Sequence, residues 1–147
     1  MTVPEPFTVA ACTWADQREA LAKIRYTVFV DEQKVPREIE LDDQDATAVH
    51  AIARDARGAA IGTGRMILQS PFPRIGRMAV LGPWRRAGVG AAILDLLCAE
   101  AKSRGYDEVM LHAQTHASPF YLKHGFAPHG AEFTEAGIPH QEMHKRV

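Results

Sequence analysis

The spacing of apolar positions along the chain predicts an alternation of strands and helices. The mostly apolar stretch from Phe7 to Trp14 is expected to form a first strand. Apolar residues then recur every three or four positions, which indicates one buried face of a helix that begins near Gln17, with Asp16 as its N-cap. The residues of that face are Leu21, Ile24, Val28 and Phe29.

Two strands joined by a tight turn are predicted next. Residues 47–55 and 59–68 both have strand character, and Ala56-Arg57-Gly58 between them is a turn sequence, so the pair forms a hairpin. Gly62 and Gly64 lie inside the second strand, where glycine marks a bulge or the close approach of another backbone.

The centre of the chain predicts a strand, a helix and a second strand. Residues 75–81 form a short apolar run that Gly82-Pro83 ends, residues 90–104 favour a helix that stops at Gly105, and residues 108–113 form the next strand. The two strands of such a unit are parallel and joined by a right-handed crossover. The buried helix positions are Val89, Ile93, Leu96 and Leu97.

The last quarter of the chain predicts a short helix and further strands. Residues 118–124 favour a helix with Ser118 as its cap, Pro119 in its first turn and Gly125 at its end. Strands are expected around Phe133 and over residues 141–145.

Length and composition limit the classes of protein that fit. The chain has 147 residues and a formal net charge of −1, so we expect one domain over residues 1–147 and no binding of nucleic acid. No apolar run approaches a membrane span, and the N-terminus has neither the basic start nor the apolar segment of a secretory signal. Cys12 and Cys98 have no metal-like spacing and are expected in the core, which makes a reducing cytoplasm the expected compartment.

The turn between the central strand and helix has the chemistry of an anion site. Residues 85–91 are basic and rich in glycine, and the first N–H groups of the following helix lack main-chain partners. The turn lacks the Lys-Ser/Thr ending of a P-loop. Ile93 stands where a dinucleotide fingerprint requires glycine or alanine. A phosphate or pyrophosphate is therefore expected here.

Two motifs resemble the GCN5-related N-acetyltransferases (the GNAT superfamily). Arg85, Gly88 and Gly90 match the Arg/Gln-x-x-Gly-x-Gly/Ala motif of that family's acetyl-CoA site. Residues 120–126, Phe-Tyr-Leu-Lys-His-Gly-Phe, match its Phe-Tyr-x-x-x-Gly-Phe signature. Segments 25–33, 45–50 and 137–140 are similar to a bacterial subgroup whose acceptors are poorly defined.

The resemblance implies a fold and a reaction. The fold is α+β with three layers, in which a mixed, mostly antiparallel sheet of six to seven strands contains a central, splayed parallel pair and about four helices flank it. The reaction is direct transfer of an acetyl group from acetyl-CoA, the co-substrate, to a primary amine. By the family pattern Tyr121 is the general acid. The implied cofactor contacts are Met78, Ala79, Val80, Arg85, Arg86, Ala87, Gly88, Val89, Gly90, Ala91, Gln114, Phe120 and Tyr121.

The general base is where the sequence departs from the family pattern. Many relatives place a glutamate on the cofactor-side strand, but residues 74–80 hold no acidic residue. Glu40 is the first candidate, His112 the second and His140 the third, since histidine has a suitable pKa without tuning. Each of these residues also has a purely structural interpretation.

The acceptor is left open between several classes. Residues 31–45 hold seven acidic residues against two basic ones, which fits either a solvated acidic loop or a wall that attracts a small cationic amine. A protein or peptide acceptor and a non-catalytic acyl-CoA sensor are the alternatives. Exposed sheet edges are where two copies of such a fold would pair into a homodimer.

No metal site is expected from the sequence. The pairs His112/His116 and His140/His144 have the i, i+4 spacing of helical ligands, but neither lies in a predicted helix. The sequence also lacks an HExxH motif.

Overall fold

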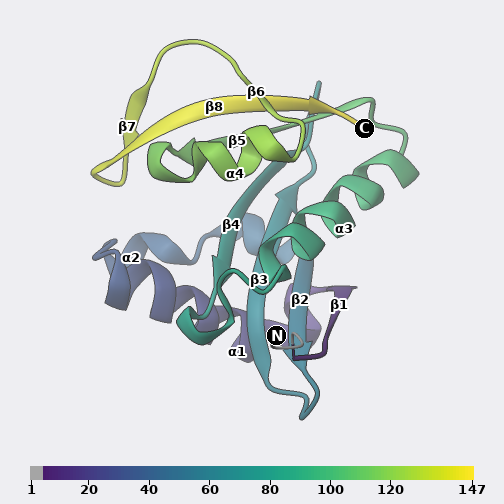
Figure 1. Cartoon of the computed structure of the whole chain (residues 1–147), viewed down its shortest axis with the longest axis vertical. Coiled ribbons are helices and arrows are strands. Elements are labelled where there is room, and N and C mark those ends of the chain that lie inside the picture. Colours follow the sequence, from purple (N-terminus) through teal and green to yellow (C-terminus); the bar gives the residue numbers. More distant parts are fainter. Residues whose placement is uncertain (1–4) are drawn as a thin grey trace.

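The computed structural model describes residues 5–147, and one mixed sheet runs through it (Figure 1). Its eight strands have the order β1-β2-β3-β4-β5-β8-β6, with β7 paired to β8. Six to seven strands were predicted, and the additional ones are short. The strands are β1 (Phe7–Cys12), β2 (Val49–Asp55), β3 (Ala60–Ile67), β4 (Arg74–Val80), β5 (Glu108–Gln114), β6 (Ala127–Pro128), β7 (Phe133–Glu135) and β8 (Ile138–Arg146).

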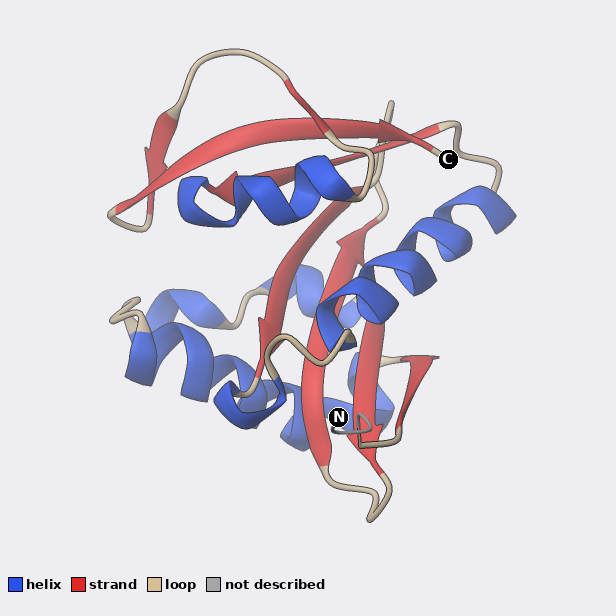
Figure 2. Ribbon diagram, viewed as in Figure 1, coloured by secondary structure: helices blue, strands red, loops and turns tan. Residues whose placement is uncertain are grey.

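Four α-helices accompany the sheet, which confirms the predicted number. They are α1 (Trp14–Arg25), α2 (Arg37–Glu40), α3 (Val89–Ser103) and α4 (Ser118–Lys123). Helix α1 continues into a π-helical segment, Tyr26–Glu32, and three short 3₁₀ turns follow later, Asp43–Ala46, Gly82–Trp84 and Thr115–Ala117. In Figure 2 α3 and α4 lie in front of the sheet, and α1 lies on the other side. Among residues 5–147 no helix is long and apolar enough to cross a membrane.

Two apolar cores lie on the two faces of the sheet. The larger core contains the inner face of α3, where Val89, Ile93 and Leu97 are buried as predicted and Leu96 is partly buried. The smaller core contains Ile24, Val28 and Phe29 of the first helical segment, packed around Ala79 of β4. The amphipathic patterns of both helices are therefore confirmed.

The central strand–helix–strand unit opens a gap in the sheet. Strands β4 and β5 are parallel, as predicted, but they pair at only two positions, Arg74 with Met110 and Ile75 with Leu111. Beyond Ile75, β4 turns away: its register with β3 shifts, and Arg77 has a positive φ of 49°. In Figure 2 the two strands diverge from their shared end. The splayed pair implied by the family resemblance is present.

The glycines of β3 let α3 approach the sheet closely. A Cβ on Gly64 would lie 2.8 Å from Ile93 Cγ2 and 2.8 Å from Met78 Sδ, and one on Gly62 would lie 3.0 Å from Val89 Cγ1. No side chain fits at either position without a shift of its neighbours. The close contacts are made by side chains of α3 and by Met78, and the register of β3 with β4 shifts between Thr63 and Arg65, so of the two predicted features the bulge is present at Gly64.

Two predicted helix caps are wrong. Thr13, not Asp16, caps α1, because its Oγ1 accepts a hydrogen bond from the Asp16 N–H at 3.2 Å and the helix starts earlier than expected. Ser118 is the first residue of α4, and Ala117 occupies the N-cap without a side-chain bond. The helix ends are as predicted, with Gly105 and Gly125 at φ values of 87° and 91°.

Candidate active site

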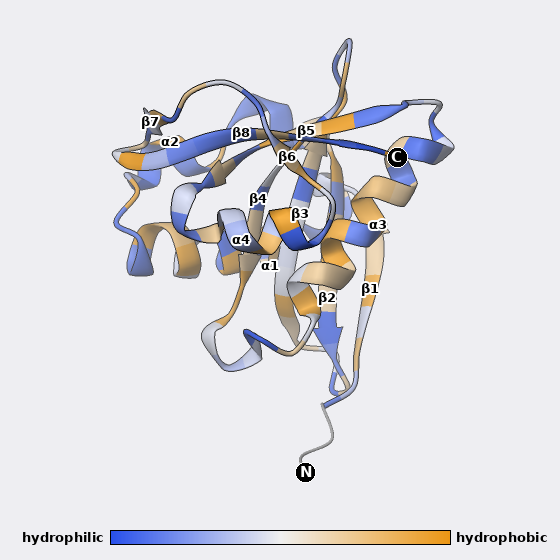
Figure 3. Cartoon of the chain, turned by 45° about the horizontal axis from the view of Figure 1, so that its top comes forward, coloured by the Kyte–Doolittle hydropathy of each residue, from blue (hydrophilic) through white to orange (hydrophobic). Residues whose placement is uncertain are grey.

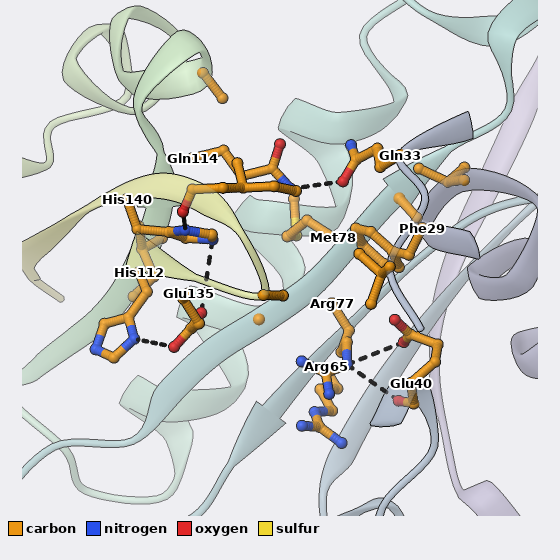
Figure 4. Close-up of a pocket in the computed structure, with 18 of the residues that line it drawn as sticks. Phe29, Gln33, Glu40, Arg65, Arg77, Met78, His112, Gln114, Glu135 and His140 are labelled. Atoms are coloured by element: carbon orange, nitrogen blue, oxygen red, sulfur yellow. Dashed lines mark hydrogen bonds and ion pairs between the residues drawn. The ribbon is translucent and has the colours of Figure 1, made fainter. Parts of the chain in front are cut away.

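A cavity of about 640 Å³ occupies the gap between β4 and β5. Strand β4 lines it from Arg74 to Val80, and β5 lines it with Leu111, His112 and Gln114. The π-helical segment closes one side, and the β7–β8 hairpin closes another (Figure 4). Of the predicted cofactor residues, six line this cavity: Met78, Ala79, Val80, Arg85, Gln114 and Tyr121.

Apart from Phe120, which lies on α4, the other predicted cofactor residues form the turn that continues from Arg85 into α3. Gly88 is the N-cap of α3 with a φ of 87°, a left-handed conformation that glycine adopts without strain, and Arg86 has a φ of 66°. In the described part of the chain, the N–H groups of residues 86–91 have no main-chain acceptor, and Gly88 makes no side-chain cap. The turn thus presents a series of free donors at a helix N-terminus, the arrangement that binds phosphate. Phe120 packs beside Gly90 at this point.

Two polar contacts link the end of the π-helical segment to other residues that line the cavity. Gln33 Oε1 accepts a hydrogen bond of 2.7 Å from Gln114 Nε2 on β5 (Figure 4). Glu32 Oε1 lies 2.6 Å from Arg85 Nη2, and Arg85 Nε donates to the carbonyl of Val80 at 2.9 Å. We refer to Gln33–Gln114 and Glu32–Arg85 as the two straps. The sequence did not indicate Gln33 or Glu32, because each pairs with a residue more than 50 positions away.

Tyr121 lies at the inner wall of the cavity. Tyr121 belongs to α4 and its side chain is mostly buried. This burial raises the pKa of the phenol to about 12. The hydroxyl therefore remains protonated throughout the neutral range. It is available as a hydrogen-bond or proton donor to a group bound in the gap.

The acidic segment 31–45 is neither fully solvated nor a free acidic wall. Arg25, which is 1% exposed, donates to Glu40 Oε2 at 3.0 Å and to Asp45 Oδ1 at 2.7 Å. Arg65 lies 2.7 Å from Asp42 and 2.8 Å from Asp45. These carboxylates are neutralised by arginines of α1 and β3, so their charge is largely unavailable to a substrate.

Glu40, the first predicted base, is held between two guanidinium groups. Its Oε2 lies 3.0 Å from Arg25 Nε and 3.0 Å from Arg77 Nε (Figure 4). Burial raises the pKa of Glu40, and the arginines only partly offset that effect. Burial alone would also raise the pKa of Asp45, but hydrogen bonds and charge from Arg25 hold it below its ordinary value. The geometry therefore favours a structural role for Glu40, as the shared partner of Arg25 and Arg77.

The β7–β8 hairpin brings a second set of titratable groups into the cavity. Glu135 Oε1 lies 3.1 Å from His112 Nδ1 and 3.3 Å from Arg74 Nη2, and Glu135 Oε2 lies 3.6 Å from His140 Nε2 (Figure 4). His140 Nδ1 donates to the carbonyl of Ile138 at 2.7 Å, which leaves its Nε2 unprotonated in the neutral ring. Two of the predicted bases, His112 and His140, are thus joined by a glutamate.

Sequence reasoning missed Glu135. Its position depends on the tight turn at Ala136-Gly137, where φ values of 52° and 75° reverse the chain so that Glu135 pairs with Ile138. A two-residue turn ending in glycine between two strands was the available signal. Burial alone would raise the pKa of Glu135, but the His112 hydrogen bond and the charge of Arg74 hold it below its ordinary value.

Comparison with known proteins gives consistent matches. A family model described as "Acetyltransferase (GNAT) domain" matches residues 15–147. The uncharacterized N-acetyltransferase YjcF of Bacillus subtilis is 39% identical over 123 residues, which cover 83% of this chain and 87% of that protein. The uncharacterized protein YyaT of the same organism is 36% identical over 137 residues, or 92% of each chain.

Solved structures with this fold include two relatives of similar length. An acyl-CoA N-acyltransferase from Pseudomonas aeruginosa is 27% identical with a TM-score of 0.84, over 95% of this chain and 99% of the other. Escherichia coli ElaA is 26% identical with a TM-score of 0.84, over 94% of this chain and 99% of the other.

Proposed function

Because the chain belongs to the GNAT family, whose fold binds acyl-CoA for N-acyl transfer, we propose that it moves an acetyl group from acetyl-CoA to a primary amine. The observation that most supports this is the gap between β4 and β5, with free N–H donors at one end and titratable groups at the other. The whole chain, residues 1–147, is proposed to act as one N-acetyltransferase domain.

The cofactor is proposed to lie along the splayed face of β4. Its pyrophosphate would bind the N–H groups of residues 86–91, and its pantetheine arm would pair with residues 78–80, which have no partner on the β5 side. A main-chain N–H near Ala79 or Val80 would then stabilise the oxyanion that forms on the thioester carbonyl. Both straps involve residues of the proposed site, since Gln114 and Arg85 are among the proposed cofactor contacts.

Tyr121 is proposed to assist the leaving group. When the amine nitrogen bonds to the carbonyl carbon and the C–S bond breaks, the electron pair stays on the sulfur of CoA. A protonated phenol beside that sulfur stabilises the thiolate and supplies its proton. Because burial raises the pKa of Tyr121 to about 12, the phenol keeps its proton in the neutral range until that step.

The base is proposed to be His140, positioned and assisted by Glu135. A lysine-like amine has a pKa of about 10.4, so freeing its lone pair at neutral pH costs roughly 4–5 kcal/mol. His140 lines the cavity, and Glu135 Oε2, 3.6 Å from His140 Nε2, would stabilise the imidazolium that forms when His140 takes the proton. We favour this pair over Glu40, whose carboxylate oxygen contacts two arginines.

The acceptor is proposed to be a small molecule whose ammonium group approaches Glu135. Asp42 and Glu40 line the cavity but contact arginines at 2.7 and 3.0 Å. Glu135 contacts Arg74 through Oε1 at 3.3 Å, and its Oε2 lies toward His140, so Oε2 is the carboxylate oxygen that would attract a cation at the reacting end. The cationic acceptor would therefore be attracted by one carboxylate, and not by the extended acidic wall that the composition of residues 31–45 suggested. A peptide acceptor remains an outcome of the acceptor screen below.

Titration calorimetry tests the cofactor site, and thiol release tests the transfer. Acetyl-CoA and CoA should bind with similar affinity, and ATP much more weakly, because only the first two hold both pyrophosphate and pantetheine. Thiol release from acetyl-CoA is then measured with small amines and with lysine peptides. Binding without release for any amine would favour a non-catalytic sensor, and no binding of either CoA form would refute the proposed site.

Variants at Glu135 and His140 test the base. His140→Ala should lower kcat about 100-fold or more at neutral pH, in the range of a lost general base. Glu135→Gln should lower kcat while acetyl-CoA affinity is unchanged. Glu132→Gln is the matched control, since Glu132 is an exposed carboxylate in the same region. Wild-type kcat in His140→Ala would exclude His140 as the base.

A further inference from the structure

We propose that His129, Glu142 and His144 form a binding site for a divalent transition-metal ion, with Zn²⁺ the best match. One ligand atom from each residue lies within 4.8 Å of the other two. The site does not depend on the proposed acyl transfer. It lies on the outer part of the sheet, where β8 is hydrophilic along much of its length (Figure 3).

The sheet itself brings the three side chains together. Glu142 and His144 are two residues apart on β8, so they project from the same face. The main chain of His129 continues β6 along β8, with its N–H donating to the carbonyl of Glu142 at 2.8 Å. The His129 and His144 rings are 4.6 Å apart between centroids. Because strand spacing, not helical spacing, makes the cluster, an i, i+4 search of the sequence misses it.

His144 has the oriented ring that metal-binding histidines have. Its Nδ1 lies 2.9 Å from Glu108 Oε2 on β5, and its Nε2 lies 2.7 Å from Glu142 Oε2. Metal ligands commonly donate the second ring N–H to a carboxylate, which fixes the tautomer and the ring plane. Glu108 occupies this supporting position, so Nε2 of His144 points at the shared ligand position. The cluster is thus more than a chance group of surface charges.

The donor set identifies the class of ion. Two imidazoles and one carboxylate form the three-residue set of open zinc sites, with solvent as a fourth ligand. Bond lengths of about 2.0–2.2 Å separate tetrahedral ligand atoms by roughly 3.4 Å. To reach that geometry, the exposed His129 would move closer, and the half-buried Glu142 would lengthen its present 2.7 Å contact with His144 Nε2. Nitrogen donors disfavour Mg²⁺ and Ca²⁺, which prefer oxygen ligands.

The site lies one side chain away from the cavity. The second oxygen of Glu142, Oε1, is 3.8 Å from His112 Nε2, and His112 in turn contacts Glu135. An ion on Glu142 would therefore sit on the opposite side of His112 from the acceptor position. This arrangement lets the site be tested both by binding and by the environment of the His112 ring.

Calorimetric titration of the untagged chain with Zn²⁺, after treatment with a chelator, tests the proposal. We expect one ion per chain. His129→Ala and Glu142→Gln should each weaken binding at least 10-fold, and Glu108→Gln should weaken it about 10–100-fold, as for other residues that orient a metal ligand. His124→Ala is the matched control, because His124 lies outside the cluster and should leave the affinity unchanged.

A spectroscopic measurement separates a specific site from binding to scattered histidines. In an NMR titration with Zn²⁺, the imidazole signals of His129 and His144 should shift together at one equivalent, with a smaller shift at His112. His129 is exposed, so the His129→Ala chain is expected to fold, and circular dichroism checks this. Equal Zn²⁺ affinity in wild type, His129→Ala and Glu142→Gln would overturn the proposal. Absence of binding at 100 µM Zn²⁺ would also overturn the proposal, because it would mean a Kd of about a millimolar or weaker.

Discussion

Replacing Asp45 with asparagine tests the interpretation that the acidic segment is a structural ion-pair cluster. Asp45 is 1% exposed and accepts hydrogen bonds from Arg25 Nη1 at 2.7 Å, Arg25 Nη2 at 3.1 Å and Arg65 Nη1 at 2.8 Å. Its Oδ2 also accepts the N–H of Asp42 at 3.2 Å. Asparagine keeps the size of the side chain but removes the charge and one acceptor, so two buried guanidinium groups lose their shared partner.

The magnitude follows from the burial of those partners. Leaving a buried charge without its counterion costs about 3–5 kcal/mol, and Arg25 is 1% and Arg65 4% exposed. Glu40 and Asp42 still contact these arginines, so we expect a loss of about 3–4 kcal/mol in the free energy of unfolding. For a domain of this size that corresponds to a fall in Tm of roughly 6–16 °C.

Urea unfolding followed by circular dichroism measures the effect, with Asp43→Asn as the control. Asp43 is an exposed acid in the same segment and should change the free energy of unfolding by less than about 0.5 kcal/mol. The folded-state pKa of Asp45 lies below that of the unfolded chain, so its contribution is complete above about pH 4 and is lost as the pH falls through the folded pKa. The difference between wild type and Asp45→Asn should therefore shrink in acid. A loss below about 1 kcal/mol at pH 7 would refute the reasoning.

Three further predictions follow from single side chains. Tyr121→Phe should lower kcat about 100-fold with an unchanged Kd for acetyl-CoA, and a loss of affinity instead would assign the hydroxyl to cofactor binding. Gly64→Ala should lower the free energy of unfolding by about 1–3 kcal/mol in urea titrations, because its Cβ would meet Ile93 at 2.8 Å, whereas Gly76→Ala meets nothing within 4 Å and should have little effect. Burial raises the pKa of Cys12 to about 11, so iodoacetamide should alkylate it roughly 100-fold more slowly at neutral pH than in the unfolded chain.

Local patterns in the sequence predicted the parts of the fold that depend on neighbouring residues. The unit from β4 through α3 to β5, the hairpin of β2 and β3, and the turn around Gly88 each follow from apolar spacing and from glycine at defined places. The cap at Asp16 failed because the Thr13 hydroxyl accepts the N–H of Asp16, which places Asp16 inside the first turn of the helix. Boundaries of this kind depend on one hydrogen bond, which the periodicity of apolar residues does not encode.

The pairing of polar side chains could not be predicted from the sequence. Arg25 and Asp45 are 20 positions apart, and Arg74 and Glu135 are 61 apart, so their contacts exist only after the sheet has formed. The acidic composition of residues 31–45 therefore suggested a charged surface, although arginines from α1 and β3 neutralise much of it. The positions of Tyr121 and His112 in the cavity agree with the expected site, while their roles stay predictions.

The short contact between β4 and β5 has a consequence for the stability of the protein in solution. Since only two residue pairs join these strands, the sheet has an incomplete seam, and a ligand that pairs with residues 78–80 would complete it. Such a ligand binds the native state alone and raises the free energy of unfolding by about 2.7 kcal/mol at a concentration 100 times its Kd. The supply of acyl-CoA would then determine how long the protein survives proteolysis, as well as how fast it works.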